Sequence, residues 1–209
     1  MKTIKQLKWR YACKKFNPNE KLTNKKIKRL KKAFQLTATS FGLQPLKMLV
    51  IENSKLKESL LEHAYHQKQI VDCSHLLVLC IDSDFNEKTI DAHFDLEKKV
   101  RGTSEKILSK FRDNLKISFS NKIDSEIKQS SIQQAYIALG NLMTVCAMEK
   151  IDACPMEGFN PIKFDETLNL KSKNLESVLL LPVGYRAEDD FMSGLKKVRK
   201  SLEDVIIDL

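Results

Sequence analysis

The stretch SEIKQSSIQQAYIALGNLMTVCAMEK, residues 125–150, decides the fold of this 209-residue chain. Ile132, Tyr136 and Met143 recur at helical spacing and form one apolar stripe, and a second apolar side includes Ile137. A helix that is apolar around most of its circumference must be buried on most sides. We therefore predict a long helix here, packed against the body of the protein and covered again by a partner subunit.

Short apolar runs on both sides of this helix predict strands. Residues 74–82 contain Leu76–Ile81, an unbroken apolar run that indicates a strand covered on both faces. Strands are also predicted at 46–51 and 178–185, and Pro182 suggests a sheet edge or a strand end. The other predicted elements are helices at 3–11, 23–36 (N-cap Thr23), 54–63 (N-cap Ser54), toward Leu170 and at 195–202, and a terminal strand at 205–207.

Helices and four or five strands in one chain, without an internal repeat or a linker, predict an α+β or α/β fold with one sheet. The length suits a single domain over residues 1–209, since chains usually divide only beyond about 250–300 residues. Residues 86–122 form a polar helical pattern with charges all round. We expect this segment to be a helical excursion from the domain.

The composition excludes several classes of protein. The longest apolar run has six residues, whereas a membrane-spanning helix needs about 20, and the N-terminus MKTIKQ has no apolar signal core. The five cysteines form no Cys-x-x-Cys pair and the four histidines no His-Glu-x-x-His pattern. We therefore expect reduced cysteines in a cytoplasmic protein that has no metal site and no membrane partner.

The net charge of +9 raises the question of a nucleic-acid partner. Basic and acidic residues are mostly interleaved, and the densest basic run is 21–32. Within that run Ile27 and Leu30 recur at helical spacing, so its lysines form the solvated face of an amphipathic helix. We favour this interpretation over a surface that contacts the phosphate backbone of a nucleic acid, so no nucleic-acid partner is expected.

The six glycines are at least ten residues apart, which rules out a glycine-rich phosphate loop. Side chains must therefore hold the phosphate of any phosphorylated cofactor, and Arg and Lys are the usual ligands. Arg10 and Lys14 lie four residues apart, and Lys197 and Arg199 lie near the other end of the chain. From spacing alone, ordinary surface charge is the favoured interpretation of each pair, and phosphate binding is the alternative.

Two connecting segments are further candidates. Residues 37–45 are rich in hydroxyl groups, and residues 154–159 are an extended stretch whose N–H groups could face a planar ligand. Taken singly, each is better interpreted as an ordinary connection between two elements. Their significance comes from five segments in a fixed order and a tail: WRYACKKFNP (9–18), TSFGLQP (39–45), QKQIVDCSH (67–75), YIALGNL (136–142), PMEGF (155–159) and KVR (197–199).

Together these segments resemble the nitroreductase family in their order and separation, over essentially the whole chain. The resemblance implies an α+β nitroreductase-like fold, with a central, mostly antiparallel sheet flanked by helices. It also implies an intertwined homodimer that holds two FMN cofactors at its interface. The implied activity is that of an FMN-dependent NAD(P)H oxidoreductase, related to nitroreductases and dihydropteridine reductases.

The resemblance also implies which residues hold the cofactor. Arg10, Lys197 and Arg199 would bind the FMN phosphate, while Lys14 and Gln69 would lie at the pyrimidine edge of the flavin ring. Thr39, Ser40 and Gly42 would belong to the partner-subunit side of the flavin pocket. The backbone of a last segment would face the flavin, with an N–H near N5: Pro155, Met156, Glu157 and Gly158.

Three positions depart from the family pattern. Arg10-Tyr11-Ala12 stands where many members have Arg-x-Ser, so one hydroxyl ligand is missing. Tyr11 and Ala12, like His66, are still expected to contact the cofactor. His66 replaces an Asn of some relatives, and Gln69 replaces a Lys. Less positive charge beside flavin N1 disfavours the negatively charged reduced flavin, so we expect a lower reduction potential.

The implied reaction requires no metal, general base or nucleophile, because the hydride chemistry belongs to the flavin. NADH or NADPH would give a hydride to flavin N5, and a quinone, nitroaromatic or similar small-molecule acceptor would then take it. One alternative is a flavin-binding protein with a sensing or storage role and little turnover. Another is a basic module that binds nucleic acid or a protein partner.

Overall fold

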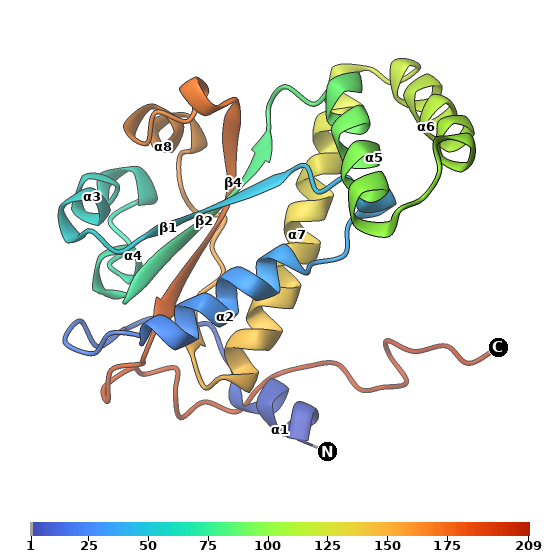
Figure 1. Cartoon of the computed structure of the whole chain (residues 1–209). Helices are drawn as coiled ribbons and strands as arrows, with labels where there is room; N and C mark the ends of the chain where they lie inside the picture. Colours follow the sequence, from blue (N-terminus) through green and yellow to red (C-terminus); the bar gives the residue numbers. More distant parts are fainter. Residues whose placement is uncertain (1) are drawn as a thin grey trace.

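The computed structural model describes residues 2–209, and one antiparallel sheet lies at its centre (Figure 1). Its four strands stand in the order β1-β2-β4-β3, with every neighbouring pair antiparallel. The predicted α+β fold with a mostly antiparallel sheet is confirmed. The strands are β1 (Leu46–Ile51), β2 (His75–Asp82), β3 (Asp152–Ala153) and β4 (Leu175–Gly184).

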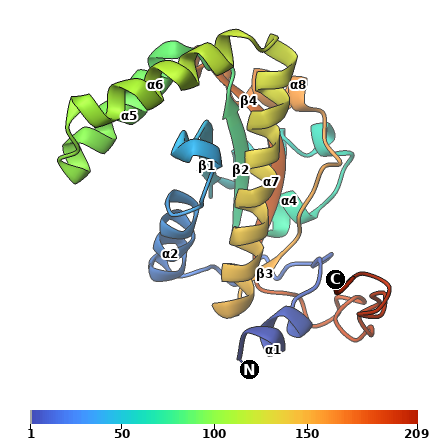
Figure 2. The same ribbon diagram turned by 90° about the vertical axis from the view of Figure 1, so that its right-hand side faces the viewer.

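Strand β2 lies between β1 and β4 and is buried on both faces, as its unbroken apolar run predicts. Successive side chains of a strand point to opposite faces. Leu77 and Leu79 therefore join the hydrophobic cluster under α2 and α7, while Leu76 and Val78 join the cluster under α3, α4 and α8 (Figures 1 and 2). These helices are α2 (Asn24–Gln35), α3 (Ser54–Ser59), α4 (Gln69–Asp72), α7 (Asp124–Met148) and α8 (Pro161–Thr167).

Helix α7 spans 25 residues and runs along the sheet (Figure 2), so the predicted long helix is confirmed. Ala138 and Leu142 are fully buried toward the sheet and α2. On another side, Tyr136 and Ile137 remain 44% and 50% exposed in the single chain. Tyr136 of the first predicted stripe and Ile137 of the second side are therefore uncovered within one chain, whereas Ala138 of the second side is buried.

Side-chain caps begin several helices. Thr23 caps α2 as predicted, with its Oγ1 accepting from the N–H of Lys26 at 3.4 Å. Asn53, not Ser54, caps α3, because its Oδ1 accepts from the N–H of Leu56 at 2.9 Å. The basic face of α2 is exposed while Ile27 and Leu30 are buried, which confirms the amphipathic interpretation.

Helices α5 (Glu87–Arg101) and α6 (Glu105–Ser120) form an antiparallel pair that extends beyond the sheet (Figure 2). They share a small hydrophobic cluster that includes Ile90, Phe94 and Leu108. The helices described for residues 2–209 include none with the length and hydrophobicity needed to cross a membrane.

Two predictions for the C-terminal region are wrong. Residues 195–202 form no helix and 205–207 form no strand; the chain beyond β4 is an extended, largely exposed tail (Figure 1). The apolar residues there have no face of this chain to pack against, and local propensity alone does not hold a short helix. Strand β4 is not at the edge, but Pro182 lies two residues before its end, so the strand-end alternative for Pro182 is correct.

Candidate cofactor site

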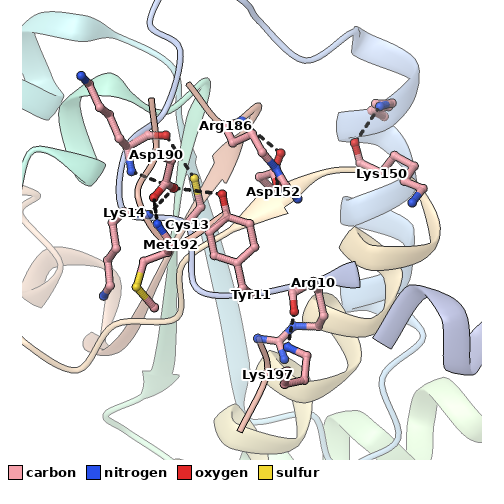
Figure 3. A network of polar contacts seen from close by, with 12 residues as sticks. Arg10, Tyr11, Cys13, Lys14, Lys150, Asp152, Arg186, Asp190, Met192 and Lys197 are labelled. Carbon is pink, nitrogen blue, oxygen red and sulfur yellow. Dashed lines mark hydrogen bonds and ion pairs between the residues drawn. The ribbon is translucent and has the colours of Figure 1, made fainter. Parts of the chain in front are cut away.

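Arg10, Lys197 and Arg199 bring positive charge together from the two ends of the chain. Arg10 follows α1 (Lys2–Trp9), and the C-terminal tail passes beside this helix (Figure 1). The Nζ of Lys197 donates a hydrogen bond to the backbone oxygen of Arg10 (Figure 3). Partial burial, and then repulsion by Arg10 and Arg199, lower the pKa of Lys197. Both arginines are therefore close enough to Lys197 to repel it.

No carboxylate neutralises this cluster. Within residues 2–209, no Asp, Glu or C-terminal oxygen lies within 4.0 Å of a side-chain nitrogen of Arg10, Lys197 or Arg199. Among residues 2–209, the hydrogen-bond partner of the Arg10 guanidinium is the thioether of Met143, at 3.9 Å. Converging cations without a counterion fit an anion, and the forked donors of Arg suit a phosphate in particular.

Arg186 is paired, in contrast, and its pairing holds the segment that carries Arg10. Its Nε and backbone N–H donate to Asp152 at 2.9 and 3.0 Å. The guanidinium also stacks on the rings of Trp9 and Tyr11, at 4.6 and 4.5 Å from the ring centroids. No motif in the sequence marks this pair, because 34 residues separate its members.

The loop after β3 presents backbone donors. Met156 forms a bridge with Leu180, whose two hydrogen bonds measure 2.9 and 3.0 Å. The next two residues, Glu157 and Gly158, are exposed, and their N–H groups have no acceptor among residues 2–209. Unpartnered donors at an accessible loop are what a hydrogen-bonding cofactor ring needs.

Gln67 ties this loop to the segment that contains His66 and Gln69. Its Nε2 donates to the backbone oxygen of Gly158 at 2.7 Å. A Cβ at Gly158 would lie 3.1 Å from the same nitrogen, so a side chain there would press on Gln67. Gln69 is buried at the start of α4, and His66 has a positive φ of 55°. The sequence offered no signal for the role of Gln67.

Several other predicted ligands lie around the same loop. The Nζ of Lys14 is 4.0 Å from the sulfur of Cys154, and Pro155 follows half-buried. Ala12 pairs with Ala153 through a parallel bridge, so its segment runs beside β3. All five cysteines of the chain are buried free thiols, and no group of three or more metal-binding side chains occurs within residues 2–209.

Thr39, Ser40 and Gly42 lie elsewhere, in and beside the 3-10 turn Ser40–Gly42. The N–H of Ser40 donates to Gln134 of α7 at 2.8 Å, whereas Arg10 contacts Met143 of the same helix. Nine residues of α-helix correspond to about 14 Å along the axis. One chain therefore does not bring this group to the cluster of Arg10, Lys197 and Arg199.

Comparison with known proteins places this geometry in a family. A profile described as "Nitroreductase family" matches residues 7–185. The chain belongs to the nitroreductase family. The resemblance inferred from the sequence motifs is thereby confirmed, and the match extends from α1 to the end of β4.

Relatives within the nitroreductase family match this chain over nearly its whole length. It is 31% identical to the "Major NAD(P)H-flavin oxidoreductase" of Aliivibrio fischeri, covering 97% of this chain and 96% of that protein. It is 26% identical to the "Oxygen-insensitive NAD(P)H nitroreductase" of Salmonella typhimurium, covering 96% of each. A protein of Exiguobacterium sibiricum crystallised with FMN has a similar fold, with a TM-score of 0.84 at 19% identity, covering 99% of this chain and 97% of that one.

Proposed function

We propose that this nitroreductase-family protein transfers hydride from NADH or NADPH to a quinone, nitroaromatic or similar small-molecule acceptor in a ping-pong reaction. Its family makes it an NAD(P)H-dependent flavin oxidoreductase, with FMN and NAD(P)H as cofactors. Bound FMN would supply the chemistry, because flavin N5 accepts a hydride and passes it on. The observation that supports this most directly is the uncompensated cluster of Arg10, Lys197 and Arg199.

The protein's own residues then have two tasks. Arg10, Lys197 and Arg199 would hold the phosphate and thereby fix the position of the flavin ring. The exposed N–H groups of Glu157 and Gly158 would donate to the edge of that ring. Neither task requires a proton to move between side chains, which agrees with hydride transfer by the cofactor itself.

We further propose a cytoplasmic homodimer in which each site is completed by both subunits. The exposed apolar side of α7 at Tyr136 and Ile137 supports a second protein surface there. The separation of Thr39, Ser40 and Gly42 from the cations of the same chain supports their acting on the partner's cofactor.

The phosphate assignment is tested by titrating FMN and riboflavin into apo-protein, because riboflavin lacks the phosphate. Charge-assisted hydrogen bonds are worth roughly 1.5–3 kcal/mol each, so Arg10→Ala and Arg199→Ala should each weaken FMN binding about 10- to 150-fold. Riboflavin affinity should barely change. The matched control is Arg101→Ala, an exposed arginine paired with Glu97 on α5, which should alter neither affinity. Unchanged FMN affinity in both test variants refutes the assignment.

Activity is tested on the purified flavin-loaded protein under anaerobic conditions. Bleaching of the flavin absorbance by NADH or NADPH, and its return on addition of a quinone or nitroaromatic, is the expected result. Bound flavin that neither NADH nor NADPH bleaches would instead favour the sensing or storage role. A protein that binds no flavin would refute both.

A further inference from the structure

Asp190 is a buried carboxylate near the start of the C-terminal tail, and it is only 2% exposed. Its Oδ2 accepts hydrogen bonds from the hydroxyl of Tyr11 at 3.0 Å and from the N–H groups of Lys14 and Lys15 at 2.9 and 3.2 Å. Its Oδ1 accepts from the N–H of Met192 at 3.0 Å. Figure 3 shows these donors converging on one side chain from both ends of the chain.

The surroundings favour the ionised form of this carboxylate. Burial by itself raises the pKa of Asp190, but the hydrogen bonds from Met192, Lys15 and Lys14 outweigh it, so the pKa is lowered overall. Tyr11 and Cys13 face the carboxylate with neutral side chains, because burial raises the pKa of both groups. An anion that accepts several N–H bonds is held more firmly than a neutral group of the same shape.

The four donors lie on the two segments that carry the predicted phosphate ligands. Tyr11 and Lys14 directly follow Arg10, whereas Asp190 and Met192 precede Lys197 and Arg199 by a few residues. The backbone supports the same contact, because the N–H of Ala187 donates to the oxygen of Lys15 at 2.9 Å. Asp190 is the buried charge that joins these segments.

We propose that Asp190 is a positioning residue for phosphate recognition: it holds the segment of Arg10 against the tail of Lys197 and Arg199. Its hydrogen bonds from Tyr11 and from the N–H groups of Lys14 and Lys15 oppose the repulsion of Lys197 by the two arginines. They add to the Ala187–Lys15 and Lys197–Arg10 hydrogen bonds between the same segments. The proposal rests on the proposed FMN site. Within residues 2–209, Asp190 forms no hydrogen bond with the side chains of Arg10, Lys197 or Arg199, so it would act through the backbone that carries them.

The test compares FMN and riboflavin affinities of the full-length chain after Asp190→Asn. Asparagine has the same shape, but its amide nitrogen cannot accept from an N–H, and the charge is lost. We expect FMN affinity to fall about 10-fold more than riboflavin affinity falls. A 10-fold change in affinity corresponds to about 1.4 kcal/mol, which is the expected effect of one misplaced ligand. In an Arg10→Ala, Lys197→Ala, Arg199→Ala background the same change should leave the ratio of the two affinities unaltered, since the ligands it positions are gone.

The matched control is Asp165→Asn. Asp165 is a partly buried carboxylate of α8 that accepts from the N–H and hydroxyl of Ser177, at 2.9 and 2.6 Å. Its loss should lower thermal stability without changing the FMN-to-riboflavin affinity ratio. A purely structural role for Asp190 predicts this same pattern for Asp190→Asn, and observing it would overturn the proposal.

A second variant covers the case in which Asp190→Asn does not fold. Tyr11→Phe removes one of the four hydrogen bonds and keeps the ring that stacks on Arg186. A smaller change of the affinity ratio in the same direction supports the proposal, and an unchanged ratio overturns it. A wild-type chain that binds FMN no better than riboflavin refutes the phosphate site itself, and the proposal with it.

Discussion

Lys57 of α3 is a lysine inside the hydrophobic core, with only 1% of its surface exposed. Its Nζ donates to the backbone oxygens of Val71 and Cys73, at 2.8 and 2.6 Å, at the end of α4. The last carbonyl oxygens of a helix accept no hydrogen bond from an N–H of the same helix, and these two oxygens are among them. Burial lowers the pKa of Lys57, and nearby Lys21 lowers it further, while Cys73, Asp72 and Glu52 act in the opposite direction.

We predict that Lys57→Met destabilises the protein, and that the loss grows as the pH rises from 7 to 10.5. Two buried carbonyls without a donor cost about 1–3 kcal/mol each, which the removal of a buried charge partly offsets at pH 7. Above its lowered folded-state pKa, the neutral amine of Lys57 keeps two N–H donors and no longer carries the cost of burying a charge.

The sign of the pH dependence follows from proton binding. Between the lowered pKa of Lys57 in the folded state and its higher pKa in the unfolded state, the unfolded chain binds more protons. The contribution of Lys57 to the free energy of unfolding therefore rises with pH in this window, by at most about 1.4 kcal/mol per unit. Other titrating groups are shared by wild type and variant, so they cancel in the difference.

The assay is urea unfolding of both proteins at matched protein and flavin concentrations, at several pH values from 7 to 10.5. Lys28→Met, on the exposed face of α2, is the control, and its difference from wild type should stay constant. A stability difference for Lys57→Met that is constant, or that narrows toward pH 10.5, would refute this account of the buried lysine.

Three further outcomes are expected. Gln67→Ala, which removes the hydrogen bond to the oxygen of Gly158, should weaken FMN and riboflavin equally in the titration, by about 2- to 12-fold, because the loop would contact the ring they share. Leu142→Ala, in the buried face of α7, should lower the free energy of unfolding by about 2–5 kcal/mol in urea. Sedimentation should find a dimer at micromolar concentration, and a flavin-loaded monomer would contradict the proposed interface.

Local patterns in the sequence were sufficient for the main elements. The apolar residues of α7 and the unbroken run in β2 predicted a buried helix and a doubly covered strand, and both are present. Such predictions succeed because the period of the hydrophobic residues records which faces of an element are buried. The same patterns failed at 195–202 and 205–207, where a weak local signal has no surface of this chain to support it.

The sequence by itself determined the family, the strands and helices of the core, and which side chains are candidates for a phosphate. Only the tertiary structure decided that Arg10 meets Lys197, and that Asp190 joins their two segments. The physical reason is separation along the chain: Tyr11 and Asp190 are 179 residues apart, and no local pattern records such a contact. The partners become neighbours only because β3 and β4 pair and bring Arg186, Asp152 and the start of the tail beside the first segment.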